Sequence, residues 1–173
     1  ERMERAIAVE VVRVLREDRA HELIDRRERV APDGIAEGFE EPRVNLQGTG
    51  RDGTITLPDL IAMSVETTFH RISPAAVFVP THSGYTARSM TRFRLPVWII
   101  AVSSQEPTCQ NLQFSYGVYP VCVAGHPADW TDHIREWVGS HGIEGELAIL
   151  TEGPSEKFPH TNHRMEIIDL KNT

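Results

Sequence analysis

The sequence predicts an α/β fold in which a mostly parallel β-sheet is covered by helices on both faces. From residue 76 onward, short apolar runs alternate with segments whose apolar residues recur at helical spacing. The run from Val97 to Val102 is apolar throughout, which is typical of parallel strands buried on both faces. The chain has 173 residues, 40% of them apolar and 25% charged, which suits one globular domain with its own core.

The first part of the chain divides into a helix and a polar connection. Residues 2–24 contain no proline or glycine, and Ile7 and Val11 fall one helical turn apart, so we expect a helix that enters the domain. Residues 25–55 are rich in glycine, proline and aspartate, which predicts a polar linker or an excursion over the surface. We therefore expect the α/β domain itself to occupy residues 56–173.

The domain begins with a helix over residues 57–72. Thr56 is the predicted N-cap, with Asp59 as its capping-box partner and Pro58 in the first turn, where proline is tolerated. The elements expected after this helix are, in order, strand 76–80, helix 86–93, strand 97–102, helix 107–115, strand 118–123, helix 128–141, strand 146–151 and strand 163–169.

A polar loop from Thr81 to Gly84 connects the first strand to a helix that starts near Thr86. A strand, a tight loop and a helix N-terminus together present backbone N–H groups to an anion, and the hydroxyls of Thr81, Ser83 and Thr86 add further donors. Gly84 lets the backbone approach a ligand closely. We expect a phosphate-binding site here, with the alternative that Ser83 or Thr86 only caps the helix.

A second loop, from Gly153 to Asn162, connects the last two strands. In an α/β sheet, the loops at the carboxyl ends of the strands surround one crevice. Lys157 is therefore expected to meet the same anion, with the alternative that this loop is a plain hairpin connection carrying an exposed lysine.

Charge and composition argue against several classes of function. A formal net charge of −7 disfavours sequence-independent nucleic-acid binding, and no segment approaches the roughly 20 apolar residues of a membrane span. The two cysteines do not make a disulfide framework, and Cys122 lies in an apolar run that predicts burial. We therefore expect a cytoplasmic protein. The chain starts inside a helix-like segment without an initiator methionine, which suggests a piece of a longer protein.

Neither a metal site nor a catalytic centre is predicted. His160 and His163 are close in sequence but fall in a loop and a strand, and no Cys-x-x-Cys or His-Glu-x-x-His spacing occurs. Ser83 could be considered a nucleophile, but the nearest base is its direct neighbour His82, whose geometry does not suit a triad. Hydrolase chemistry at Ser83 stays an alternative that needs a second base close to the hydroxyl.

The stretch from Thr56 to Leu170 resembles the C-terminal domain of pyruvate kinase. The resemblance rests on short motifs that follow one another in the family's order. These motifs are Thr-Leu-Pro-Asp-Leu-Ile-Ala-Met at 56–63, Phe-Val-Pro-Thr-His-Ser-Gly-Tyr-Thr-Ala at 78–87, Arg-Phe-Arg at 92–94, Ile-Ile-Ala-Val at 99–102, the stretch 108–120, Gly-Glu-Leu at 145–147 and Thr-Asn at 161–162.

The resemblance implies a three-layer α/β/α sandwich on a five-stranded mixed, mostly parallel sheet whose last strand is antiparallel. It also implies that the domain binds a phosphorylated allosteric effector in the loop from Thr81 to Thr86. Trp130 and Arg135 resemble an effector-contacting pair, and the segment from Gly153 to Asn162 resembles the effector loop.

The identity of the effector stays open. His82 and Tyr85 belong to the same loop, but they occupy positions that are often basic in family members activated by sugar bisphosphates. The resemblance further implies a homotetramer in which this domain builds one interface. It implies a parent enzyme that transfers a phosphoryl group from phosphoenolpyruvate to ADP with magnesium and potassium.

The motifs of the family's catalytic barrel are missing from this sequence, so the chain is expected neither to catalyse that transfer alone nor to hold its cofactors. Two alternatives stay open beside a regulatory domain of pyruvate kinase. One is a stand-alone module that senses a phosphorylated metabolite, and the other is a purely structural domain that supports oligomerisation.

Overall fold

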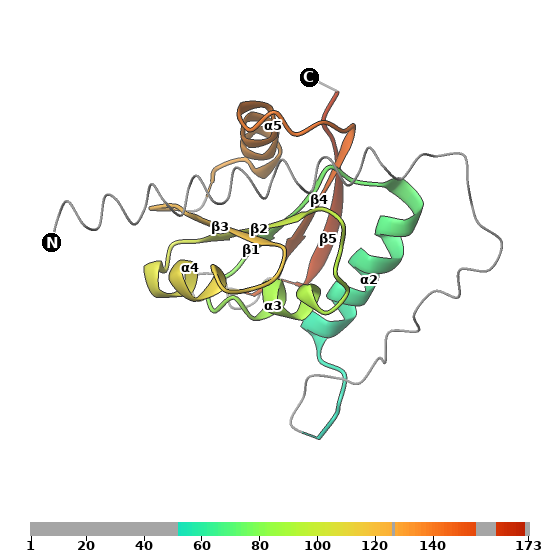
Figure 1. Ribbon diagram of the computed structural model, residues 1–173, viewed down its shortest axis with the longest axis vertical. Helices are drawn as coiled ribbons and strands as arrows, with labels where there is room; N and C mark the ends of the chain where they lie inside the picture. Colours follow the sequence, from blue (N-terminus) through green and yellow to red (C-terminus); the bar gives the residue numbers. More distant parts are fainter. Residues whose placement is uncertain (1–51, 126, 155–161, 172–173) are drawn as a thin grey trace, which may run out of the picture. The chain divides into compact units, whose positions relative to one another are not determined.

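The computed structural model describes residues 52–125, 127–154 and 162–171 (Figure 1). The predicted helix 2–24, nearly all of the predicted linker 25–55 and Lys157 lie outside these ranges. The helices and strands are α2 (Leu57–Ile72), β1 (Ala76–Pro80), α3 (Tyr85–Thr91), β2 (Trp98–Ser103), α4 (Glu106–Leu112), β3 (Val118–Cys122), α5 (Trp130–Ser140), β4 (Leu147–Glu152) and β5 (Arg164–Asp169).

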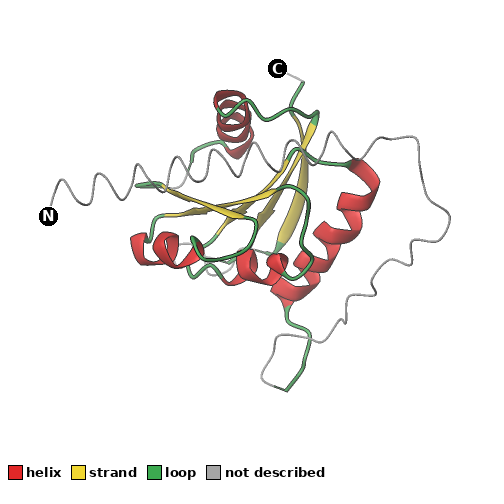
Figure 2. Cartoon of the chain, in the orientation of Figure 1, coloured by secondary structure: helices red, strands yellow, loops and turns green. Residues whose placement is uncertain are grey.

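The strands form one five-stranded sheet in the order β3-β2-β1-β4-β5 (Figure 2). β1 is parallel to β2 and β4, and β2 is parallel to β3, whereas β5 runs antiparallel to β4. Helices α2, α3 and α4 pack on one face of the sheet, and α5 packs on the other (Figures 1 and 2). The predicted three-layer sandwich with an antiparallel last strand is confirmed.

The central strand β1 contributes to a hydrophobic core on each face of the sheet. Val77 and Val79 belong to the core under α2, α3 and α4, whereas Ala76 and Phe78 belong to the core under α5. This alternation follows from the two-residue period of a strand, which sends successive side chains to opposite faces. Because both faces are covered by helices, the strand consists of an unbroken apolar run.

Helix α2 begins with the predicted capping box. The backbone N–H of Asp59 donates to Thr56 Oγ1 at 3.3 Å, and the N–H of Thr56 donates to Asp59 Oδ2 at 2.9 Å. The Asp59 side chain is fully buried, and its other carboxylate oxygen lies 3.5 Å from Arg92 Nη1. The capping box therefore also joins α2 to the end of α3, because a buried carboxylate requires a charged or hydrogen-bonded partner.

Several predicted boundaries move, each for a local reason. The helix expected over 107–115 is shorter, because the chain turns after Leu112 and reaches β3 through Gly117, whose φ is 67°. The helix expected over 86–93 ends at Thr91, and Arg94 has a left-handed φ of 48° that no helix continues.

The predicted burial of Cys122 is wrong, since its side chain is exposed. The residue ends β3, which lies at the edge of the sheet, so only one neighbouring strand flanks it.

In the described ranges, no helix is both long enough and apolar enough to cross a bilayer.

Candidate functional site

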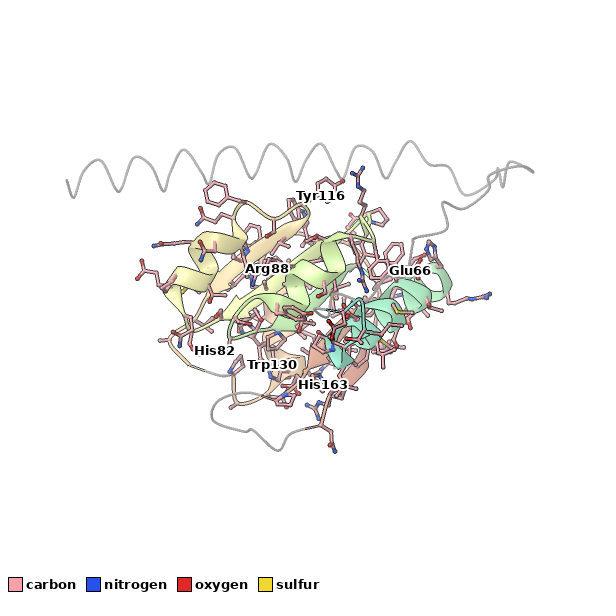
Figure 3. All side chains as sticks on the ribbon, turned by 90° about the horizontal axis from the view of Figure 1, so that it is seen from below. Glu66, His82, Arg88, Tyr116, Trp130 and His163 are labelled. Atoms are coloured by element: carbon pink, nitrogen blue, oxygen red, sulfur yellow. The ribbon has the colours of Figure 1, made fainter. Side chains whose placement is uncertain are left out.

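The loops that follow the parallel strands lie together at the carboxyl ends of those strands. The Thr81–Gly84 loop follows β1, and the connection after β3 leads to Trp130 at the start of α5. His163 lies at this same end of the sheet, although it precedes its strand. The reason is that β5 is antiparallel, so its first residue, Arg164, pairs with Glu152, the last residue of β4. Figure 3 shows the labelled His82, Trp130 and His163 along one side of the domain.

The Thr81–Gly84 loop is closed by the side chain of its first residue. The Thr81 N–H continues the sheet by donating to Val102 O at 2.9 Å, and Thr81 Oγ1 accepts the N–H of Gly84 at 2.9 Å. Gly84 is the N-cap of α3, with a φ of 76°. The alternative prediction, that Ser83 or Thr86 caps this helix, is therefore wrong, because a glycine without a side chain occupies the cap.

Two carbonyl groups of the loop are held by donors from the neighbouring helices. Thr108 Oγ1, on α4, donates to His82 O at 2.8 Å, and Arg88 Nη2, on α3, donates to Ser83 O at 2.7 Å. In a trans peptide the C=O and the next N–H point in opposite directions. The N–H of Gly84 therefore points away from Arg88 and toward Thr81 Oγ1, and the N–H of Ser83 points away from Thr108.

Four donor groups of the loop, the amides and hydroxyls of Ser83 and Thr86, make no hydrogen bond among the described residues. Ser83 is exposed and Thr86 is half-buried. The amides of Thr81 and Gly84 already donate hydrogen bonds within the protein. The donors predicted for an anion are therefore reduced to the groups of Ser83 and Thr86.

Arg88 is a candidate site residue that the sequence interpretation missed. It begins the second turn of α3, where its N–H donates to Gly84 O at 3.0 Å, and its guanidinium folds back over the loop. A Cβ added at Gly84 would lie 2.8 Å from Arg88 Nη1 and 3.0 Å from Leu112 Cδ2. The sequence did carry a signal for Arg88. It lies four residues after Gly84, and residues four apart on a helix are neighbours.

The other predicted contact residues are placed differently. Trp130 is only 8% exposed and packs in the core between α5 and the sheet. Arg135 Nη2 and Nε donate to the carbonyl oxygen of Asp169 at 3.0 and 3.3 Å. Asp169 pairs with Leu147, the first residue of β4. Arg135 therefore lies at the end of the sheet opposite the Thr81–Gly84 loop. Lys157 is not among the described residues.

The described residues offer the loop little other chemistry. They contain no group of three or more side chains that could hold a metal ion. Among them, no base is hydrogen-bonded to Ser83 Oγ, so the arrangement required for a serine nucleophile is not assembled there. What the geometry supports is recognition of an acceptor-rich group by hydrogen-bond donors beside one guanidinium.

Comparison with known proteins matches the described domain to one family. Residues 59–168 match the family model described as "Pyruvate kinase, alpha/beta domain". A pyruvate kinase of Thermococcus litoralis is 43% identical over 110 residues, which cover 62% of this chain and 23% of that protein. A pyruvate kinase of Staphylococcus aureus is 30% identical over 118 residues, covering 65% of this chain and 20% of that protein.

Solved structures agree on the fold. The solved structure titled "Cryptosporidium parvum pyruvate kinase in complex with ADP" superposes with a TM-score of 0.60 at 22% identity, covering 68% of this chain and 24% of that one. This chain thus spans about a fifth to a quarter of the length of the proteins it matches. The matched region extends from the capping box of α2 to the last strand, and on this basis the chain belongs to the pyruvate kinase family and contains its C-terminal α/β domain.

Proposed function

We propose that this domain binds a phosphorylated small molecule in the Thr81–Thr86 loop and thereby regulates a pyruvate kinase. The observation that carries the proposal is that, within the described chain, the amides and hydroxyls of the exposed Ser83 and the half-buried Thr86 have no hydrogen-bond partner. A phosphate group presents several strong acceptor oxygens and therefore suits a set of converging donors. The helix dipole of α3 favours an anion at the same position.

Arg88 would supply positive charge to this site. Its Nη2 is already bound to Ser83 O, but a guanidinium has five N–H donors and can hold a carbonyl oxygen and a phosphate oxygen at once. His82 and Tyr85 are exposed on the same loop and are proposed as its rim. Lys157 and the segment from Gly153 to Asn162 remain proposed contacts from the second loop, and Trp130, at the start of α5, from the α5 region, whereas Arg135 lies at the opposite end of the sheet, where it binds Asp169 O.

Calorimetry with two charge variants tests this proposal. Inorganic phosphate and a panel of sugar phosphates are titrated into the wild type, Ser83→Asp and Ser64→Asp. Ser64 is exposed on α2, so its variant adds the same charge away from the loop. We expect S83D to abolish binding by placing a carboxylate against phosphate, and S64D to bind like the wild type. Equal binding by S83D and the wild type would refute the proposed site.

A second function, contact between subunits, is favoured by the edge strand β5. Its outer edge has no strand partner within the described part of the sheet, and Ile167 is 47% exposed. An open edge with an apolar side chain can pair with another chain. We propose that β5 contributes to a homo-oligomer, a tetramer in the parent enzyme.

Sedimentation velocity tests the proposed subunit contact with Ile167→Lys. The control is Ile55→Lys, because Ile55 is 50% exposed but lies before α2 and outside the sheet. The wild type and I55K should sediment as the same oligomer, and I167K should sediment as a smaller species. If the wild type is monomeric, or if I167K keeps its assembly, β5 is not the contact.

The parent activity also belongs to the proposal. We propose that the domain serves an enzyme of the cytoplasm that transfers a phosphoryl group from phosphoenolpyruvate to ADP, with magnesium and potassium acting in a catalytic barrel whose motifs this sequence lacks. A stand-alone sensing module would bind phosphate without altering the activity of such a barrel. A purely structural domain would not bind phosphate at all.

A further inference from the structure

Cys109 and the residue that follows Cys122 both contact one backbone oxygen, that of Ser103. Cys109 lies on the buried side of α4, and its Sγ is 3.7 Å from the carbonyl oxygen of Ser103 at the end of β2. The N–H of Val123, the residue after Cys122, donates to that same oxygen at 3.0 Å. Ser103 and Cys122 are also partners in the parallel pairing of β2 and β3.

The environments of the two thiols differ sharply. Cys109 is 6% exposed, whereas Cys122, at the end of the edge strand, is open to solvent. Burial, followed by a hydrogen bond with the thiol of Cys122, raises the pKa of Cys109 to about 12. At neutral pH the Cys109 side chain is therefore a protonated thiol, and only Cys122 can react first with a reagent from solution.

We propose that Cys109 and Cys122 form a reversible dithiol modification site, which a low-molecular-weight disulfide oxidises to an intramolecular disulfide. The Cys122 thiolate attacks one sulfur of the reagent, forms a mixed disulfide and releases one small thiol. Cys109 then loses its proton to solvent and attacks the Cys122 sulfur, which expels the second small thiol. Two protein thiols and one small disulfide thus give one protein disulfide and two small thiols.

The order of these steps follows from the neighbours of Cys109. A negative charge on Cys122 and the hydrogen bond between the two thiols both oppose ionisation of Cys109. Once Cys122 is capped as a mixed disulfide, it carries no charge, so that repulsion disappears at the stage when Cys109 must ionise. The buried thiol is therefore the resolving group, and the exposed thiol is the initiating one.

Mass spectrometry of the native protein treated with oxidised glutathione tests the site. After an acid quench, remaining thiols are alkylated with N-ethylmaleimide under denaturing conditions, and the intact mass and the cysteine peptides are measured. The wild type should lose both alkylation sites without retaining glutathione and should give a peptide pair that joins Cys109 to Cys122. Cys109→Ser should stop at the glutathione adduct of Cys122.

The complementary variant tests which sulfur reacts first. Cys122→Ser, which keeps only the buried thiol, should react at least about tenfold more slowly than C109S in the native state and at a similar rate in denaturant. A wild type that stops at the glutathione adduct, as C109S does, would overturn the proposal. Equal native rates for the two variants would overturn it as well. If a variant fails to fold, the wild-type product still tests the proposal, because an intramolecular disulfide supports it and a stable glutathione adduct overturns it.

Discussion

The hydroxyl of Thr108 donates a hydrogen bond of 2.8 Å to the carbonyl oxygen of His82, across a sequence separation of 26 residues. This bond joins α4 to the loop after β1 and fixes the peptide plane that carries the Ser83 N–H. A donor whose direction is fixed before binding loses less conformational entropy when a ligand arrives. The proposed phosphate site therefore depends on α4 although α4 contributes no direct ligand to it.

Thr108→Val keeps the shape of the side chain but removes the donor. We expect phosphate to bind about fivefold to tenfold more weakly, because one hydrogen bond contributes about 1 kcal/mol. Calorimetry measures the change, and Thr67→Val, on the exposed part of α2, is the matched control. An unchanged affinity in T108V would mean that the loop keeps its conformation without α4.

Arg88→Ala removes the cation beside the loop and the donor to Ser83 O. Affinity for phosphate should fall by about tenfold or more, since a charge-assisted hydrogen bond contributes about 1.5–3 kcal/mol. The dependence of affinity on salt should also weaken, because fewer charges take part. Arg71→Ala removes an equal charge from the exposed end of α2 and should leave both quantities unchanged. Matching behaviour of the two variants would exclude Arg88 from the site.

Asp59→Ala should strongly destabilise the domain. The substitution removes the capping box of α2 and the fully buried carboxylate that lies beside the guanidinium of Arg92. We expect the free energy of unfolding to fall by about 3 kcal/mol, measured by urea denaturation. Asp132→Ala changes a side chain that is 81% exposed and should cost less than about 0.5 kcal/mol. A loss of similar size in both variants would contradict the role assigned to Asp59.

Gly84→Ala tests the close packing beneath the loop. Alanine must adopt the φ of 76°, and its Cβ would lie 2.8 Å from Arg88 Nη1 and 3.0 Å from Leu112 Cδ2. Gly142→Ala is a matched control, because Gly142 has a φ of 61° but no atom within 4 Å of an added Cβ. Both variants should lose about 1 kcal/mol to backbone strain, and G84A should lose roughly a further 1 kcal/mol to crowding. Thermal unfolding that ranks the two variants equally would show that the crowding is relieved.

The parts of the fold that sequence predicts well are those set by neighbours along the chain. The capping box joins Thr56 to Asp59, three residues on, and the apolar run of β1 reports burial on both faces without knowledge of its partners. Loop composition likewise located the hydroxyls of the candidate site. Each of these features is encoded within a few residues, so propensity and pattern suffice to find it.

The parts that sequence could not predict depend on contacts between distant segments. Thr108 and His82 are adjacent only because β1 and β2 are parallel neighbours, and α4 follows β2. Cys122 has apolar neighbours in sequence, yet it is exposed because β3 lies at the sheet edge. Arg135 binds the carbonyl oxygen of Asp169, a partner that no local pattern identifies.

Amide chemical shifts during a phosphate titration test the central claim most directly. In ¹H–¹⁵N spectra, the amide resonances of Ser83 and Thr86 should shift together and saturate with one dissociation constant. Those of Thr81 and Gly84, whose N–H groups already donate within the protein, should shift much less. If Ser83 and Thr86 stay unshifted at saturating phosphate, or if the largest changes lie away from this loop, the loop is not the anion site.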